Sequence, residues 1–554
     1  MNRLLLLLIV LLVSCQTKTS YDIILRNGTV YNGTGTAPVK ADIAISGDTI
    51  AAIGNLKTAT AQQDINVEGM AIAPGFINML SWANESLIED GRSQGDIRQG
   101  VTLEVFGEGV SDGPLTDWMK KEREQLEGDI KYPVTWTTLR EFLDFLAKKG
   151  VSCNVASFIG ATTVRIHELG YADRAPDADE LQRMKQLVRQ AMEEGAVGLA
   201  SSLIYAPAFY AKTDELIELA KVAAEFDGLY ISHLRSEGDQ FLPALNELIT
   251  ISKSAGIRSE IYHLKAAGQK NWHKLDLAIA RLDSARAAGL QITTDMYTYT
   301  AAATGLNACM PPWVQEGGNE EWCKRLKDKT IRTRLIEEIS EPGESWENFY
   351  DLAGTPDNIL LVGFSADSLK NYTGKTLSEV AKIRKTHPIE TMMDLVANNG
   401  KDVGAVYYLM SEENVKKQLR LPYMSICSDS ESQSPDGVFL KSSVHPRAYG
   451  TFARLLGKYV RDEKVMTLEE AVRRLSGLPA ENLRLDRRGK LVPGFYADVV
   501  VFDPLKVADL ATFTSPQQFS TGMVHVFVNG RQVIKDGEHT GEKAGRVVGR
   551  RTKT

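Results

Sequence analysis

Residues 229–238 read LYISHLRSEG, a short apolar run that ends at His233 in a polar segment. Residues 260–268 read EIYHLKAAG and repeat the arrangement, with His263 at the end of the run. Short apolar runs separated by amphipathic stretches are typical of buried parallel strands that alternate with helices. The two segments therefore predict neighbouring strands, each of which carries an imidazole at its carboxyl end.

Eight such runs occupy the centre of the chain. They are Phe76–Leu80, Thr102–Phe106, Asn154–Phe158, Val197–Ala200, Leu229–Ser232, Glu260–Tyr262, Gln291–Thr294 and Met424–Cys427. Eight βα units is the number in a closed (β/α)8 TIM barrel, an α/β fold whose active sites lie at the carboxyl ends of the strands. The gap before the eighth run is longer than one unit. We expect a helical insert there, at about residues 305–370, placed to act as a lid near the barrel mouth.

Both ends of the chain have a different pattern, with short segments in which apolar and polar residues alternate as in β-strands. The N-terminal end contains the turn signal Asn27-Gly28 and the C-terminal end contains Asn529-Gly530, each between apolar segments that predict a hairpin. Two β-rich ends around a long centre predict one small β-sandwich domain formed by both termini. The expected domains are residues 21–73 plus 485–548 for this β domain and residues 74–484 for the barrel.

Composition excludes several classes of protein. The chain has 554 residues, of which 43% are hydrophobic and 24% are charged, and this balance is that of a globular protein rather than a disordered or multi-span membrane protein. A formal net charge of -7 offers no basic surface, so we expect no nucleic-acid partner. Five cysteines are too few for a scaffold held together by disulfides.

The first fifteen residues are typical of a bacterial lipoprotein signal. Arg3 precedes the apolar run Leu4–Val13, which is too short to span a bilayer and fits the core of a signal peptide. The run ends at Ser14-Cys15 in a motif that resembles a lipobox, where the chain is cut before a cysteine that carries a diacylglycerol. We therefore expect a signal peptide at residues 1–14 and a polar tether at residues 15–20. Acylated Cys15 would anchor the protein in the lipid bilayer of the cell envelope, at the outer membrane and facing the periplasm.

The barrel interpretation brings a carboxylate to the two imidazoles, because Asp429 follows the eighth run. Two imidazoles and a carboxylate at a barrel mouth form a borderline-soft metal site, of which Zn²⁺ is the usual occupant. An open position on such a metal holds a water of lowered pKa. The pattern indicates metal-assisted hydrolysis.

The sequence resembles a known family, the N-acyl-D-amino-acid deacylases (D-aminoacylases) of the amidohydrolase superfamily. The resemblance covers nearly all of the chain after the tether. Its anchors are Ala73-Pro74-Gly75-Phe76-Ile77, Gln99-Gly100-Val101-Thr102, Ser232-His233-Leu234-Arg235, His263-Leu264-Lys265, residues 295–301 (DMYTYTA), Thr304-Gly305-Leu306, Pro311-Pro312-Trp313, His445-Pro446-Arg447, residues 449–452 (YGTF) and residues 494–498 (GFYAD).

The resemblance implies a metal-dependent hydrolase of an amide bond. It assigns His233 and His263 as metal ligands and Asp429 as the general base, which takes a proton from the activated water and passes it to the leaving amine. It further implies that the substrate is contacted by Lys265, Tyr297, Arg447, Arg235 and Thr304. An arginine among these contacts suits a bidentate grip on a carboxylate.

The chain departs from the family at one metal. The family has a His-x-His pair after the first strand, and Leu80 and Trp82 stand at those two positions here. A bridging cysteine of the family falls within one position of Glu108, and a carboxylate is an acceptable zinc ligand. We therefore expect one Zn²⁺ per chain, held by Glu108, His233 and His263.

Two readings follow. The first is a lipid-anchored mononuclear hydrolase of N-acyl amino acids, D-configured by resemblance, or of related amides such as dipeptides or cyclic imides. The second, motivated by the lost histidine pair, is an inactive relative that binds a ligand in the barrel mouth without hydrolysis.

Overall fold

The computed structural model describes residues 20–343 and 345–551. The expected signal peptide and Cys15 lie outside these residues. Within them, no helix combines the length and the apolar character needed to cross a bilayer.

The predicted barrel is confirmed. Each of the eight predicted runs overlaps a strand: β6 (Phe76–Asn78), β7 (Val101–Phe106), β8 (Asn154–Ser157), β10 (Gly198–Ser202), β11 (Leu229–His233), β12 (Arg258–Ile261), β13 (Ile292–Met296) and β17 (Met424–Ile426). Neighbouring strands pair in parallel, and the short strand β9 (Ile159–Gly160) joins the end of β8 to β10. The barrel closes where Ser81 pairs in parallel with Ser430, next to the hydrogen bond from Asp429 N to Leu80 O at 2.9 Å.

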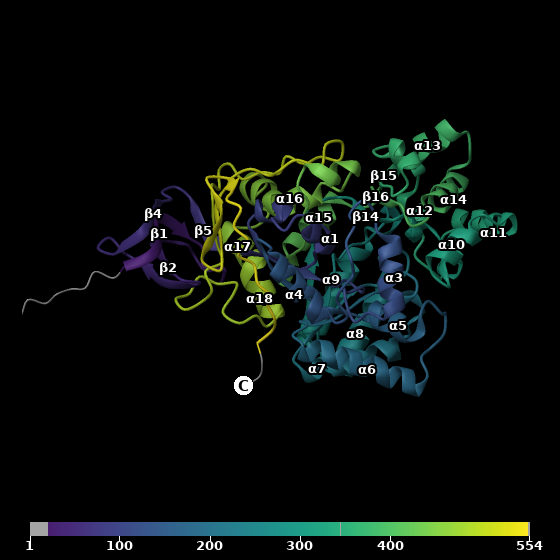
Figure 1. The fold of residues 1–554 in the computed structure, drawn as a ribbon, viewed down its shortest axis with the longest axis horizontal. Helices are drawn as coiled ribbons and strands as arrows, with labels where there is room; N and C mark the ends of the chain where they lie inside the picture. The colour runs from purple at the N-terminus through teal and green to yellow at the C-terminus, as the bar shows by residue number, and fades with distance from the viewer. Residues whose placement is uncertain (1–19, 344, 552–554) are drawn as a thin grey trace, which may run out of the picture.

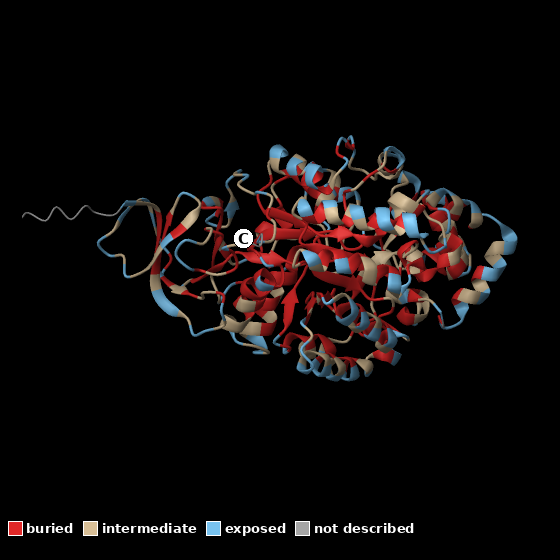
Figure 2. Cartoon of the chain, turned by 90° about the horizontal axis from the view of Figure 1, so that it is seen from below, coloured by how far each residue is buried: buried red, intermediate tan, exposed pale blue. Residues whose placement is uncertain are grey.

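Helices surround the strands and expose their outer faces, while the strands form the buried centre (Figure 2). The helices that follow the middle strands are α4 (Leu139–Lys149), α5 (Ala161–Leu169), α6 (Ala178–Glu193), α7 (Thr213–Glu225), α8 (Phe241–Ala255) and α9 (Lys274–Ala287). Two of them begin with a capping box, formed by Thr138 with Glu141 and by Asp177 with Glu180. These caps satisfy backbone N–H groups that the first helical turn leaves without partners.

Both termini build one nine-stranded sheet beside the barrel. Its strands are β1 (Ser20–Val30), β2 (Val39–Ser46), β3 (Thr49–Gly54), β4 (Thr60–Asn66), β5 (Ala71–Pro74), β18 (Val499–Phe502), β19 (Met523–Val528), β20 (Arg531–Lys535) and β21 (Glu538–His539). The two ends of the chain meet where β18 pairs antiparallel with β5 and with β19. In Figure 1 the purple N-terminal strands lie directly beside the yellow C-terminal segments.

The expected hairpin at Asn27-Gly28 is wrong, because β1 runs straight through these two residues. The pairing of β1 with β2 shifts register between Leu25 and Gly28, so the dipeptide forms a β-bulge. Asn27 takes a φ of 64°, and its N–H donates to Asp42 Oδ1 at 2.9 Å. An Asn-Gly pair tolerates the left-handed backbone of a bulge as readily as that of a turn.

The insert before the last barrel strand is longer than the expected residues 305–370 and is only partly helical. It contains a three-stranded antiparallel sheet, β14 (Ala302–Gly305), β15 (Ile359–Gly363) and β16 (Gly404–Tyr407), with β16 in the centre. Its helices include α10 (Asn319–Arg325), α11 (Lys329–Ser340), α12 (Phe349–Ala353), α13 (Leu377–Arg384) and α14 (Pro388–Asn399). The insert forms the end of the molecule opposite the N-terminal strands (Figure 1).

Candidate active site

A cavity of about 610 Å³ opens at the carboxyl ends of the barrel strands. Its lining includes Glu108, His233, His263 and Asp429 from the barrel, together with residues of the insert such as Thr304. TIM-barrel enzymes have their active sites at this end of the barrel, so the cavity is the expected position of the active site.

Three donor atoms converge at one side of the cavity. His263 Nε2 lies 3.0 Å from Glu108 Oε1 and 3.0 Å from His233 Nδ1, and His233 Nδ1 lies 3.3 Å from Glu108 Oε1. Ligands about 2.1 Å from a tetrahedral zinc are themselves about 3.4 Å apart. The triangle formed by the three residues therefore has the size of one face of a zinc coordination shell.

The backbone places these donors through unusual conformations. Glu108 follows Gly107, whose φ is 101° and where an added Cβ would lie 2.5 Å from the backbone oxygen of Phe158. Only glycine fits that position without strain. His263 itself has a φ of 32°, and its N–H donates to Asp295 Oδ1 at 2.6 Å. A histidine in this region of φ marks a conformation that its surroundings enforce.

The three residues are buried, and their charges act on one another at short range. Burial alone would raise the pKa of Glu108, but its hydrogen bonds to His233 and His263 hold that pKa well below its usual value. Burial and the charge of Lys265 lower the pKa of His263, but nearby carboxylates outweigh them and raise this pKa to about 10. Without a metal, the surrounding carboxylates therefore favour the protonated form of His263, and a divalent cation held by the same residues would take the place of that proton.

Glu237 is a site residue that the sequence prediction missed. Its Oε1 atom lies 2.5 Å from Lys265 Nζ and 3.1 Å from His263 Nδ1, and Lys265 Nζ lies 2.7 Å from His263 Nδ1. Burial alone would raise the pKa of Glu237, but the charges of Lys265 and the two histidines outweigh burial and lower this pKa. Its Oε2 atom lies 3.8 Å from His233 Nε2, so Glu237 contacts the outer nitrogens of both imidazoles. The available signal was its place four residues after His233.

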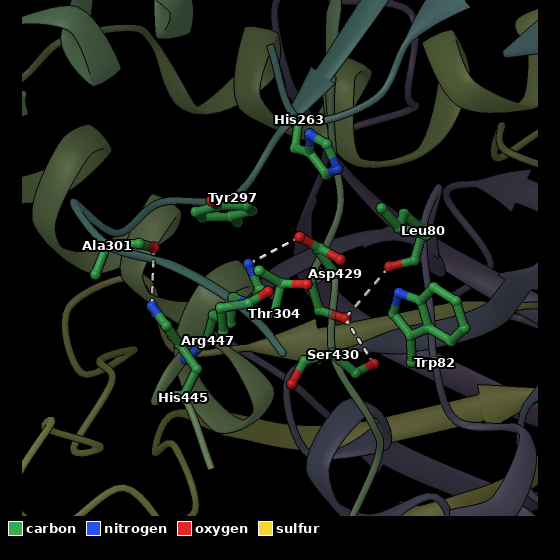
Figure 3. A network of polar contacts seen from close by, with 12 residues as sticks. Leu80, Trp82, His263, Tyr297, Ala301, Thr304, Asp429, Ser430, His445 and Arg447 are labelled. Atoms are coloured by element: carbon green, nitrogen blue, oxygen red, sulfur yellow. Dashed lines mark hydrogen bonds and ion pairs between the residues drawn. The ribbon is translucent and has the colours of Figure 1, made fainter. Parts of the chain in front are cut away.

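Asp429 faces the cavity from the end of β17, with a φ of 50°. Its Oδ2 atom lies 2.8 Å from Arg447 Nη1, the ion pair drawn in Figure 3. Burial raises the pKa of Asp429, and the charge of Arg447 opposes that effect. Arg447 is held in turn by His445, whose Nδ1 accepts a hydrogen bond from Arg447 N at 2.9 Å and whose Nε2 donates to Ala301 O at 3.0 Å.

Trp82 and Leu80, which stand where the family resemblance places a histidine pair, both border this site. The indole Nε1–H of Trp82 donates to Glu108 Oε2 at 3.1 Å, so it engages the carboxylate oxygen that faces away from the imidazoles. Leu80 is fully buried, and its backbone oxygen accepts the hydrogen bond from Asp429 N. Trp82 lies beside Asp429 in Figure 3.

The expected substrate contacts divide into two groups. Lys265, Tyr297, Arg447 and Thr304 line the cavity. The guanidinium of Arg447 lies 4.5 Å from the centre of the Tyr297 ring, and besides the ion pair of its Nη1 with Asp429, its Nε has no hydrogen-bond partner among the described residues. Thr304 Oγ1 lies 2.8 Å from the hydroxyl of Tyr205.

Arg235 does not belong to the cavity, so its expected role as a substrate contact is wrong. Its Nε and Nη2 donate to the carboxylate of Glu247 at 2.8 and 2.9 Å. Its remaining donors bind the backbone oxygens of Phe209 and Ala211, each at 2.9 Å. The side chain is therefore used to attach α8 to the loop after β10.

Comparisons with known proteins agree with the fold. A model of the amidohydrolase family matches residues 159–534. The D-aminoacylase of Alcaligenes xylosoxydans xylosoxydans is 30% identical over 535 residues, which is 96% of this chain and 98% of that protein. The crystal structure of the N-acyl-D-glutamate deacylase of Bordetella bronchiseptica, in complex with zinc and a phosphonate inhibitor, superposes with a TM-score of 0.78 at 29% identity and covers 96% of this chain and 99% of that one. A D-aminoacylase structure with a binuclear metal centre has the same TM-score at 29% identity, covering 96% of this chain and 100% of that one.

Proposed function

The chain belongs to the amidohydrolase family, and from this premise we propose that it is a metal-dependent hydrolase of N-acyl D-amino acids. The observation that carries the proposal is the triangle of Glu108, His233 and His263 beside Asp429 in a cavity that also presents Arg447. The D-configuration rests on the relatives named above, which act on D-amino-acid derivatives.

We propose one Zn²⁺ per chain, held by Glu108, His233 and His263. This is the one group of metal-ligating side chains with converging donor atoms in the part of the chain that the structure describes. Leu80 and Trp82 offer no ligand for a second ion. When bound, zinc supplies a Lewis acid that polarises the scissile carbonyl and lowers the pKa of a water.

The protein's own residues then handle the proton. Asp429 accepts the proton of the attacking water on its carboxylate and delivers it to the leaving amine. Burial favours this role, because a raised pKa makes the carboxylate a better proton acceptor. Arg447 keeps the proton acceptor oriented through its 2.8 Å ion pair with Oδ2.

We further propose that Arg447, Lys265 and Tyr297 hold the substrate carboxylate. Arg447 lines the cavity, and its Nε, which has no hydrogen-bond partner among the described residues, remains as a donor for the carboxylate. Lys265 adds a second positive charge, and Thr304 would contact the substrate from the insert side of the cavity, which it lines.

The test of the function is metal analysis combined with a substrate panel. Protein purified without chelator is expected to contain about one equivalent of zinc and to hydrolyse N-acetyl-D-alanine but not N-acetyl-L-alanine. A His233→Ala/His263→Ala variant should lose both metal and turnover, since two of three ligands are gone. A protein without metal that hydrolyses no N-acetyl-D-amino acid would instead be a ligand-binding relative.

We also propose that Cys15 is acylated and anchors the protein to the cell envelope, at the outer membrane and facing the periplasm. The proposal is supported by the sequence of residues 1–15 alone. Peptidoglycan-derived D-residues would then lie within reach of the enzyme.

A further inference from the structure

One part of the cavity lining is rich in hydrogen-bond acceptors. We call it the acceptor wall, and it consists of Trp82, Glu85, Glu431 and Gln433. The wall comes from two segments, one after β6 and one after β17. The backbone N–H of Trp82 donates to the oxygen of Ser430 at 2.9 Å, so the two segments form one continuous surface.

Neither carboxylate of the wall forms an ion pair with a cation in the described chain. Glu85 Oε1 accepts a hydrogen bond from the hydroxyl of Tyr132 at 2.9 Å, and Glu431 accepts one from the amide of Gln433. Lys401 also lines the cavity, but its Nζ donates to the backbone oxygen of Leu126 at 2.6 Å. The wall therefore presents two carboxyl groups that no cationic side chain of the described residues contacts directly.

Gln433 adds an independent sign of a missing ligand. It is 6% exposed, and its Oε1 atom has no hydrogen-bond partner within the described residues. A buried amide oxygen without a partner costs free energy, and such a group calls for an explanation. Because the amide N–H of Gln433 faces Glu431, its oxygen is fixed as an acceptor.

The electrostatics of the wall agree with this geometry. Burial, together with the charge of Glu85, raises the pKa of Glu431 to about 7. A positive group bound at the wall would stabilise the ionised form of Glu431 and reverse this shift.

We propose that the acceptor wall binds an ammonium group carried by the acyl part of the substrate. This inference rests on the proposed function. In Figure 3 Arg447 and Trp82 lie on opposite sides of Asp429. A substrate whose carboxylate meets Arg447 and whose amide lies at Asp429 extends its acyl group toward Trp82.

The chemistry of the wall matches a primary ammonium. Its N–H donors match the carboxylates of Glu85 and Glu431, and a turn of the Gln433 amide, whose oxygen is closed to solvent and without a partner among the described residues, would add a third acceptor. The ring of Trp82 lines the same space and offers a face for a cation–π contact. The acyl group that carries an ammonium next to the scissile carbonyl is an aminoacyl group, so the substrate class is a dipeptide with a free amino terminus and a D-residue at its carboxyl end.

The experiment compares two isosteric substrates, glycyl-D-alanine and N-propionyl-D-alanine, which differ by an ammonium in place of a methyl group. Hydrolysis adds water across the amide bond, so the first yields glycine and D-alanine. At pH 7 the glycyl amine, with an ordinary pKa of about 8, is mostly protonated. We expect kcat/KM for the glycyl substrate to exceed that for the propionyl substrate by about tenfold or more, because charge-assisted hydrogen bonds are strong.

Two variants test whether the acceptor wall causes the preference for the glycyl substrate. Glu431→Gln should reduce the ratio of the two kcat/KM values toward one. The matched control is Glu89→Gln on α1 (Asn84–Glu89), an exposed residue outside the cavity lining, which should leave the ratio unchanged. An unchanged ratio in Glu431→Gln would overturn the assignment of the wall.

A second pair of substrates tests where the ammonium sits. N-Propionyl-D-lysine should show no advantage over N-propionyl-D-norleucine, and an advantage only in this pair would place the ammonium on the side chain and overturn the proposal. Equal rates for the glycyl and propionyl substrates would also overturn it, while leaving the proposed deacylase function in place. Failure of the function itself is distinguishable, because then neither substrate is hydrolysed.

Discussion

His263 and Asp429 have left-handed backbone conformations, with φ of 32° and 50°. Such conformations cost roughly 1–3 kcal/mol each for residues other than glycine, and they persist where surrounding contacts enforce them. Those contacts are the hydrogen bonds from His263 N to Asp295 Oδ1 and from Asp429 N to Leu80 O. The strain turns both side chains from the strand ends into the cavity.

Replacement of Asp429 by Asn tests the proton-transfer role. The amide keeps the shape of the side chain but cannot accept the proton, so kcat should fall by about 10²-fold or more. Zinc content should stay at the wild-type value, since Asp429 is not among the three proposed ligands. Steady-state kinetics and metal analysis of the same sample decide the matter, and retained turnover would remove the residue from this role.

Replacement of Trp82 by Phe tests whether the indole N–H positions Glu108. The variant keeps an aromatic ring but loses the 3.1 Å hydrogen bond to Oε2. Partners behind a metal ligand typically contribute 10–100-fold to affinity, so we expect zinc to bind about tenfold more weakly in a chelator competition. Trp118→Phe is a suitable control, because that tryptophan is 43% exposed and lies outside the cavity lining. Equal affinity in wild type and Trp82→Phe would show that Glu108 needs no such support.

At the scale of elements, a buried polar network joins the terminal sheet to the barrel. Asp498, just before β18, forms an ion pair with Arg488 and accepts the backbone N–H of Asn529 at 2.8 Å. The side chain of Asn529 donates to Asn154 Oδ1 at 2.8 Å, in the first residue of barrel strand β8. Three parts of the chain, at residues 154, 488–498 and 529, are thereby joined.

Asp498→Ala should destabilise the whole protein. The substitution leaves Arg488, which is 8% exposed, without its ionic partner, and breaking a buried pair in this way costs about 3–5 kcal/mol. The free energy of unfolding from denaturant titration measures the change. Glu538→Ala is the control from the same sheet, because its partner Arg98 meets it at an exposed site and such pairs contribute at most about 1 kcal/mol. Similar losses in both variants would contradict the proposed importance of the network.

At the scale of the whole molecule, strand β1 and the insert lie at opposite ends of the long axis (Figure 1). The chain enters the fold at Ser20 in β1, within the terminal sheet. An anchor at residue 15 would therefore attach the molecule by its sheet end and leave the insert, which forms part of the cavity lining, directed away from the bilayer.

Cys15→Ser tests this attachment. Without the thiol no diacylglycerol is added, so the variant should leave the membrane fraction after cell fractionation. Its kcat/KM for N-acetyl-D-alanine should equal that of wild type, because the anchor is remote from the cavity. Thr17→Ser, two residues along the tether, should stay in the membrane fraction. A Cys15→Ser protein that remains in the membrane fraction would exclude the lipid anchor.

The sequence by itself determined the barrel, because apolar runs of strand length alternate with amphipathic stretches and only the buried strand positions are continuously apolar. It also placed His233, His263 and Asp429 near one another, since the carboxyl ends of parallel strands meet at one face. Glu108 followed from the same rule together with the family resemblance. These inferences need only local periodicity and the geometry common to all such barrels.

Only the tertiary structure decided where individual side chains point after the strands end. The side chain of Arg235 binds Glu247, whereas the carboxylate of Glu237, two residues later, contacts the imidazoles of His233 and His263. The indole of Trp82 donates a hydrogen bond to Glu108, which lies 26 residues later in the sequence. The amide of Gln433 donates one to Glu431, whose carboxyl group also senses the charge of Glu85 from another segment. No local sequence pattern predicts contacts between segments so far apart. The physical reason is that each direction is set by partners distant in the sequence, through charge neutralisation and hydrogen bonding that exist only once the barrel has closed.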